Sequence, residues 1–434
     1  MTQSGTRNPA GGALSRRRFL QTTAATAGAA AGSGILGAPM IWAQNIKDVV
    51  LNQVGPSYSV ISDITEKASA DLGFRIVPQT ADSTSLMAKV VNQSETIDIA
   101  DLEFWAMQKV WRSGKLQPVE IARINLWDKM TPLMRDGKNF DGSDLSRQGT
   151  MPFEVMYTGG PGDTQFAAEA TAWATTMPTI YNADTVGIRP DLIGRPIESW
   201  AELFNPEFKG KTAMVNIPQI GIMDAAMALE AMGEITYGDK GNMTREELDH
   251  TINRLIELKR AGQFRAFWST FDESVNLMAA GEVVIQSMWS PAVTAVKSRG
   301  IECIYQGLKE GYRGWGLGMG LMGHLDGLKR DAAYEYMNWY LTGWQGAFIA
   351  RQGYYSSVPE TALANLTPNE VGYWYEGKPA TEDILDPYGA IMDKAGAVRD
   401  GGSFEDRMGN VACWNTVMDE ERYMVQRWND FISA

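Results

Sequence analysis

Histidine and cysteine are the scarcest residue types in this 434-residue chain, which has two of each. His250 and His324 are too few for a histidine-ligated metal site or a histidine-based catalytic triad. Cys303 and Cys413 cannot form a disulfide framework, and the sequence leaves open whether they form one bridge. The motifs G-x-S-x-G, H-E-x-x-H, C-x-x-C and the P-loop are absent as well. These absences leave little basis for histidine-based catalysis or metal binding, and we expect no metal and no cofactor.

Positive charge is also in short supply. The chain has 39 Lys and Arg against 52 Asp and Glu, which gives a net charge of −13. The first 43 residues hold four arginines and no acid, so the remainder carries −17. We expect no nucleic-acid partner, because phosphate binding needs a positive field. An acidic chain instead favours a cationic or neutral ligand.

The N-terminal segment is typical of an export signal. Residues 15–20 read S-R-R-R-F-L, which is the twin-arginine pattern, and a mild apolar stretch follows over 22–38. Ala43 supplies a small residue for cleavage, so residues 1–43 are expected to be a twin-arginine signal peptide. A basic, alanine-rich tail is the alternative. No later run reaches the roughly 20 apolar residues of a membrane-spanning helix, which predicts a soluble protein in the periplasm.

Short strands and helices alternate at the start of the remaining chain. The pattern predicts strands over 48–54, 74–77 and 97–100, with helices over 60–72 and 83–92 between them. Such alternation indicates a mostly parallel sheet flanked by helices. Ligands bind such sheets at the carboxyl ends of their strands, here near 54–58 and 101–105.

A second α/β region begins near Thr176. Its clearest element is a helix over 244–261, with a capping box formed by Thr244 and Glu247 and a stop at Gly262. The chain from Lys329 onward reads as mostly helical. Residues 318–323 match G-x-G-x-x-G by letter, but they lie in a glycine-rich apolar run that favours a strand with closely approaching backbones.

Aromatic residues stand at the ends of several predicted segments. Trp105, Trp289, Trp315 and Tyr354 do so outside any helical stripe, and Glu103 lies at a strand end beside Trp105. Several rings can enclose an ammonium group, because a ring face attracts a cation. Each tryptophan taken alone is better explained as part of the hydrophobic core.

Four segments carry a resemblance to a known family. Residues 199–211, S-W-A-E-L-F-N-P-E-F-K-G-K, resemble the SWADLW-PEYKGK segment of extracellular solute-binding proteins of ABC importers, and of their spermidine/putrescine-binding branch in particular. Three further segments support the resemblance: residues 281–289, the pair Gly314-Trp315, and Gly353-Tyr354 followed by Pro359. The resemblance extends from about Val49 to the C-terminus, with 126–170 as an enlarged insertion.

The resemblance implies a two-lobed periplasmic-binding-protein fold (type II), in which crossing strands join two α/β lobes. Lobe 1 would comprise residues 44–174 and about 317–360, and lobe 2 about 175–316 and 361–434. The protein would be a monomer that delivers a small molecule to an ABC permease in the inner membrane and performs no chemistry. The resemblance also implies a ligand pocket lined by side chains from both lobes and from the crossing strands. The residues expected to line it are Tyr58, Glu103, Trp105, Asp224, Trp289, Trp315, Tyr354 and Asn415.

The sequence departs from the polyamine-binding pattern at two places. In the loop over 216–224, only Asp224 is acidic, and Leu317 stands where an acid would follow the tryptophan matching Trp315. Because an unpaired buried ammonium is costly, this argues against a long amine held at both ends. We therefore expect a small nitrogenous organic cation with one charged head, whether polyamine-like, quaternary or opine-like. The alternatives are an exported metal- or cofactor-containing enzyme and a binding protein that signals to a receptor.

Overall fold

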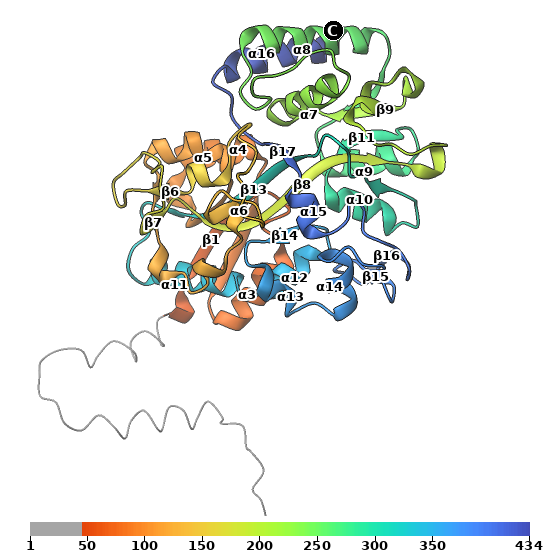
Figure 1. Ribbon diagram of the computed structural model, residues 1–434. Coiled ribbons are helices and arrows are strands. Elements are labelled where there is room, and N and C mark those ends of the chain that lie inside the picture. The colour runs from red at the N-terminus through yellow and green to blue at the C-terminus, as the bar shows by residue number, and fades with distance from the viewer. Residues whose placement is uncertain (1–45) are drawn as a thin grey trace, which may run out of the picture. The chain divides into compact units, whose positions relative to one another are not determined.

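The computed structural model describes residues 46–434, apart from the side chain of Thr84 (Figure 1). The predicted signal peptide over 1–43 lies outside these residues. None of the helices in the described part of the chain is long and apolar enough to cross a membrane.

One mixed sheet organises the chain, in the strand order β2-β1-β3-β13-β8-β11-β9-β10. Its first group of parallel strands is β1 (Val50–Gly55), β2 (Arg75–Thr80) and β3 (Ile99–Glu103). The second group, also parallel, is β9 (Thr212–Val215), β10 (Phe264–Trp268) and β11 (Ile285–Met288). The long strands β8 (Met177–Ile188) and β13 (Tyr312–Met322) pair antiparallel to each other and join the two groups. The predicted fold class, two parallel α/β groups connected by crossing strands, is confirmed.

Short strands extend this arrangement. β4 (Leu116–Gln117) and β17 (Val411–Trp414) pair with β13, and β12 (Ile304–Tyr305) and β14 (Tyr355–Ser356) pair with β8. Separate small sheets are formed by β5 (Val119–Glu120), β6 (Tyr157–Thr158) and β7 (Trp173–Ala174), and by β15 (Ile384–Leu385) and β16 (Ile391–Asp393).

Helices cover both groups of strands. The helices of the first part of the chain are α3 (Ser62–Leu72), α4 (Ser83–Asn92), α5 (Phe104–Val110) and α6 (Pro132–Arg135). Those between β8 and β13 are α7 (Pro218–Ala231), α8 (Arg245–Arg260), α9 (Phe271–Ala279) and α10 (Ser290–Lys297). The C-terminal third contains α11 (Gly327–Tyr340), α12 (Trp344–Ala350), α13 (Pro359–Leu363), α14 (Pro368–Trp374), α15 (Phe404–Met408) and α16 (Glu421–Ser433). Helices α7, α8 and α16 lie together in Figure 1.

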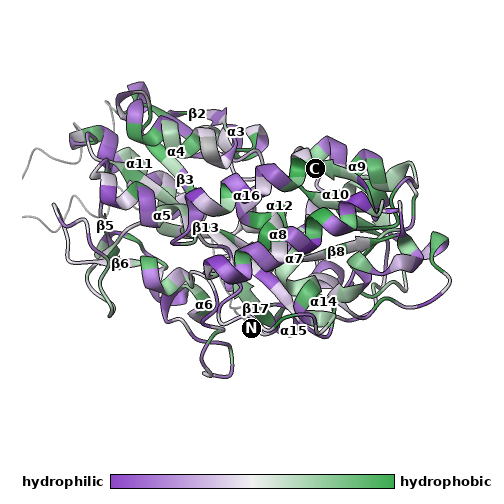
Figure 2. Ribbon diagram, turned by 90° about the horizontal axis from the view of Figure 1, so that it is seen from above, coloured by the Kyte–Doolittle hydropathy of each residue, from purple (hydrophilic) through white to green (hydrophobic). Residues whose placement is uncertain are grey.

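The residue pair that predicted the start of α8 also caps it in the structure. The Thr244 side chain accepts a hydrogen bond from the Glu247 backbone, and the Glu247 side chain accepts one from the Thr244 backbone. Leu248, Ile252 and Leu255 are buried along one face, and polar residues occupy the other face (Figure 2). This division drives packing of the helix against its neighbours α7 and α16.

Glycines in β13 allow neighbouring strands to approach closely. A Cβ atom on Gly318 would lie 2.7 Å from the backbone oxygen of Met177 in β8, and one on Gly314 would lie 2.7 Å from Cγ1 of Val411 in β17. The run from 314 to 322 is therefore a buried strand of the sheet, as predicted, rather than a dinucleotide-binding turn.

The buried hydrophobic residues form separate clusters for the two groups of strands. The first combines residues from 49–183 with residues from 312–414, and the second combines residues from 186–308 with residues from 413–431. A smaller third cluster lies within 213–305. Tyr373 and Phe404 belong to the first cluster, although the segment 361–434 is expected in lobe 2. The lobe boundaries stay a prediction.

Candidate ligand-binding site

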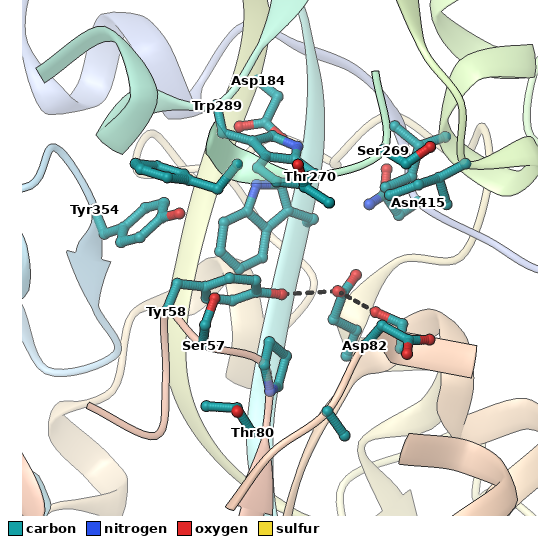
Figure 3. A pocket seen from close by; sticks show the side chains of 18 residues that line it. Ser57, Tyr58, Thr80, Asp82, Asp184, Ser269, Thr270, Trp289, Tyr354 and Asn415 are labelled. Carbon is teal, nitrogen blue, oxygen red and sulfur yellow. Dashed lines mark hydrogen bonds between the residues drawn. The ribbon is translucent and has the colours of Figure 1, made fainter. Parts of the chain in front are cut away.

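A cavity of about 470 Å³ lies where the two groups of strands meet the crossing strands. Such a volume is typical of small-molecule sites. Most of its walls come from segments that follow the carboxyl ends of strands, as expected for sheets of this kind. In Figure 3, Ser57, Tyr58, Thr80 and Asp82 face Asp184, Trp289, Thr270, Ser269 and Asn415 across it. The lining residues are Pro56, Ser57, Tyr58, Thr80, Ala81, Asp82, Ser83, Glu103, Asp184, Ile217, Ile220, Ser269, Thr270, Phe271, Trp289, Trp315, Tyr354 and Asn415.

Glu103 is held on one side of the cavity by three hydrogen-bond donors. It is the last residue of β3, directly before α5, and is 7% exposed. Its carboxylate accepts hydrogen bonds from the Tyr58 hydroxyl at 2.7 Å, from the Ser83 hydroxyl at 3.3 Å and from Nε1 of Trp105 (Figure 3, dashed lines, for the first two). Burial, together with the Glu103 charge, raises the pKa of Tyr58 well above its ordinary value. Tyr58 therefore stays a protonated donor that fixes the carboxylate in place.

Asp184 provides a second carboxylate from the middle of the crossing strand β8. Its side chain accepts a hydrogen bond from the Tyr305 hydroxyl at 2.8 Å and lies 3.4 Å from Nη2 of Arg313. The same guanidinium donates to Asp224 at 2.8 Å and to the Asn415 side-chain oxygen at 2.7 Å. Burial raises the pKa of Asp184 and of Asp224, and the charge of Arg313 opposes that rise. One buried cation thus connects two carboxylates with Asn415 in the cavity wall.

Aromatic rings form a continuous wall. The ring of Tyr58 lies 5.2 Å from that of Trp315 and 5.8 Å from that of Tyr354, and the last two are 5.5 Å apart. Trp289, directly after β11, packs at 88° to Trp268 with the ring centres 4.8 Å apart. Edge-to-face contacts of this kind hold the rings in fixed orientations and leave ring surface for a cation.

The structure brings together most of the side chains that the sequence predicted for a pocket. Tyr58, Glu103, Trp289, Trp315, Tyr354 and Asn415 all line the cavity. Trp105 and Asp224 do not: Trp105 is buried behind Glu103, and Asp224 is buried behind Arg313. Contact of any of these residues with a ligand stays a prediction.

Sequence reasoning missed other lining residues. Asp184 had a detectable signal, because it is the one charged residue of β8, whose residues are all buried. Asp82 and Ser83 come after β2, and Ser269 and Thr270 come after β10, at positions that the same strand-end argument covers. The side chains on these loops could not be ranked without the structure.

The charged residues that line the cavity are all acidic. Asp82, Glu103 and Asp184 line it, and its described lining residues include no lysine, arginine or histidine. Within residues 46–434, no group of three or more histidine, cysteine or acidic side chains is placed to hold a metal ion. Cys303 and Cys413 are buried free thiols, and burial raises the pKa of each to about 12. The cavity therefore offers carboxylates, hydroxyls and ring faces, which suits binding of an organic cation.

The model of the family described as bacterial extracellular solute-binding protein matches residues 63–371. The match covers most of the chain, which belongs to this family. That membership supports the predicted binding function over an exported enzyme. No curated protein matches the chain.

Solved structures of related fold include several binding proteins of ABC transporters. A putative spermidine/putrescine ABC transporter protein from Listeria monocytogenes aligns with a TM-score of 0.62 at 15% identity, over 88% of this chain and 98% of that one. The TpPotD lipoprotein of Treponema pallidum aligns with a TM-score of 0.59 at 9% identity, over 89% and 98%. The binding protein MotA of A. tumefaciens B6, in complex with glucopine, aligns with a TM-score of 0.55 at 15% identity, over 88% and 99%. At these identities the similarity establishes the fold.

Proposed function

We propose that this protein is the periplasmic substrate-binding component of an ABC importer, which captures a small nitrogenous organic cation and delivers it to a permease. The family is one of extracellular solute-binding proteins, and the neighbouring structures are named for polyamines and an opine. The binding protein itself carries out no reaction in this account.

The observation that carries the proposal is the lining of the cavity. Glu103 and Asp184 are buried carboxylates, and Tyr58, Trp289, Trp315 and Tyr354 present aromatic rings beside them. A cation over a desolvated ring gains about 0.5–2 kcal/mol, and a hydrogen bond to a carboxylate adds about 1.5–3 kcal/mol. An anion would meet only like charge in the lining, and a neutral sugar would leave Glu103 without a counter-charge.

The additional carboxylates change one expectation about the ligand. From the sequence, Glu103 was the acid expected to face a single cationic head, whereas Asp82 and Asp184 also line the cavity. An amine with a second donor group is therefore compatible with the site. Arg313 neutralises part of the charge of Asp184, so Glu103 is the stronger anchor for the first ammonium group.

Ligand binding would also favour closure of the two lobes. Tyr58 and Glu103 belong to the first group of strands and the loops that follow it, and Thr270 and Trp289 to the second. A ligand that contacts both sets gains its full binding energy only when they are close, so it shifts the equilibrium toward the closed form.

Export through the twin-arginine pathway, action in the periplasm and a monomeric state complete the proposal. The S-R-R-R-F-L sequence at 15–20 supports the pathway, and membership of an extracellular family supports export. Replacing Arg16 and Arg17 with lysine should leave the precursor uncleaved in the cytoplasm. Normal export of that variant would contradict the assignment of the pathway.

A thermal-shift panel tests the binding function. Purified protein is heated with monoamines, diamines, quaternary ammonium compounds and opines, and with sugars and dicarboxylates as comparison classes. A ligand at 100 times its dissociation constant adds about 2.7 kcal/mol of stability, which raises Tm measurably. We expect a rise with one class of amine. A rise with sugars or dicarboxylates alone would refute the proposed ligand class.

A further inference from the structure

A second cavity of about 420 Å³ adjoins the first one. The two share Ser57, Tyr58, Phe271, Trp289 and Tyr354 as lining residues. The two cavities therefore meet at these shared residues, most of which are aromatic, and each shared ring presents surface to both cavities. We call the cavity with Glu103 and Asp184 the inner cavity and the adjoining one the outer cavity.

The outer cavity has walls of its own from distant parts of the chain. Val60, Ile61, Ser62 and Asp63 come from the start of α3 and the turn before it. Pro291 belongs to α10, Gln352 follows α12, and Tyr388 comes from the turn between β15 and β16.

Tyr388 and Asp63 face the same space. The Tyr388 side chain is 67% exposed, and its ring packs edge-on against Phe348 with the ring centres 6.0 Å apart. Both side chains line the outer cavity, and the charge of Asp63 adds to burial in raising the pKa of the Tyr388 hydroxyl. An exposed aromatic ring fixed at the edge of a cavity is well placed to cover a ligand.

The charge of the outer cavity matches that of the inner one. Asp63 is its charged residue, and the described residues that line it include no basic side chain. A carboxylate in this space would face Asp63 without a counter-charge. A group that donates hydrogen bonds, such as an ammonium or hydroxyl group, would find Asp63, Ser62, Gln352 and Tyr388 as acceptors.

We propose that the cleft binds an elongated organic cation in two subsites, with its head at Glu103 in the inner cavity and a hydrogen-bond-donating far end at Asp63 and Tyr388 in the outer cavity. This inference rests on the proposed function and narrows it. The chain between the two ends passes the rings of Tyr58, Trp289 and Tyr354, which are common to both cavities. Compounds with a carboxylate at the far end, such as amino acids of the same length, are disfavoured.

Calorimetric titration with a series of linear compounds tests the two subsites. The probes are monoamines, terminal diamines and terminal amino acids of increasing chain length. Wild-type protein should bind the longer diamines more tightly than the monoamine or the amino acid of equal length. Asp63→Asn should weaken binding of the longer diamines by about two- to fivefold, as expected for a partly exposed charge pair, and leave the short monoamine unaffected.

Glu66→Gln is the matched control, because Glu66 lies on α3 like Asp63 but lines neither cavity. It removes the same charge and should leave all affinities unchanged. Tyr388→Ala should reproduce the selective loss for long diamines.

The outcomes separate the inference from the function beneath it. If no amine of any length binds the wild type, the proposed function and the inference both fail. If amines bind but affinity is independent of length and of Asp63→Asn, the two-subsite inference is overturned and the function stands. Tighter binding of the amino acids than of the diamines also overturns the inference.

Discussion

Replacing Glu103 with glutamine is the substitution that most specifically removes the proposed anchor. The carboxylate is 7% exposed and is oriented by the hydroxyls of Tyr58 at 2.7 Å and Ser83 at 3.3 Å. Glutamine keeps the size of the side chain and removes its charge. A hydrogen bond between an ammonium group and a carboxylate is worth about 1.5–3 kcal/mol, so Kd should rise about 10- to 150-fold.

The assay is calorimetric titration of wild type and Glu103→Gln with the amine that gives the largest thermal shift. Circular dichroism verifies that the variant is folded. Glu66→Gln again serves as the control for loss of one negative charge, and its Kd should stay within about twofold of the wild type. If Glu103→Gln binds within the same twofold range, Glu103 does not hold the cationic head and the reasoning about the inner cavity is refuted.

Three further substitutions test the surroundings of the cleft. Arg313→Met leaves Asp184 and a second carboxylate buried without their cation, and should lower the free energy of unfolding by about 3–5 kcal/mol in denaturant titrations. Arg245→Met removes an exposed ion pair and should lower it by less than about 1 kcal/mol. Equal losses in the two variants would contradict the burial argument. Burial raises the pKa of Asp101 from 3.8 to about 6. As the pH rises between these values, the Asp101 carboxyl ionises in the unfolded chain before it ionises in the folded protein, so the free energy of unfolding falls. Asp101→Asn removes this loss, and its stability relative to wild type should increase by about 2 kcal/mol between pH 4 and pH 7; a constant difference would refute the assignment. Trp289→Ala should weaken amine binding by about 2- to 30-fold in calorimetry, and an unchanged Kd would show that this ring does not contact the ligand.

Local patterns in the sequence were sufficient to predict the first strands and helices of the fold and helix α8. Helix α4 occupies Ser83–Asn92 as predicted, because its serine and threonine cluster marks the start. Strand β3 was predicted over 97–100 but extends over Ile99–Glu103, since pairing with β13 carries the ladder past the apolar run. Such pairing depends on residues more than 200 positions apart and leaves no local signal.

The site was predicted only in part, for a similar reason. Strand ends identified Tyr58, Glu103 and Trp289, because their positions follow from the order of strands. Trp105 and Asp224 are buried beside the cavity and do not line it. Their positions depend on their partners in the fold, because Trp105 donates a hydrogen bond to Glu103 and Asp224 pairs with Arg313, which is 89 residues away in the sequence.

Three compounds that differ only in their end groups test whether the acidic, aromatic cleft binds an organic cation. Purified protein is titrated by calorimetry with diaminopentane, pentanediol and pentanedioate, which share one chain length and differ in charge. We expect the diamine to bind, the diol to bind far more weakly and the diacid to give no heat of binding. Tighter binding of the diacid than of the diamine would contradict the proposal that the cleft binds a cation.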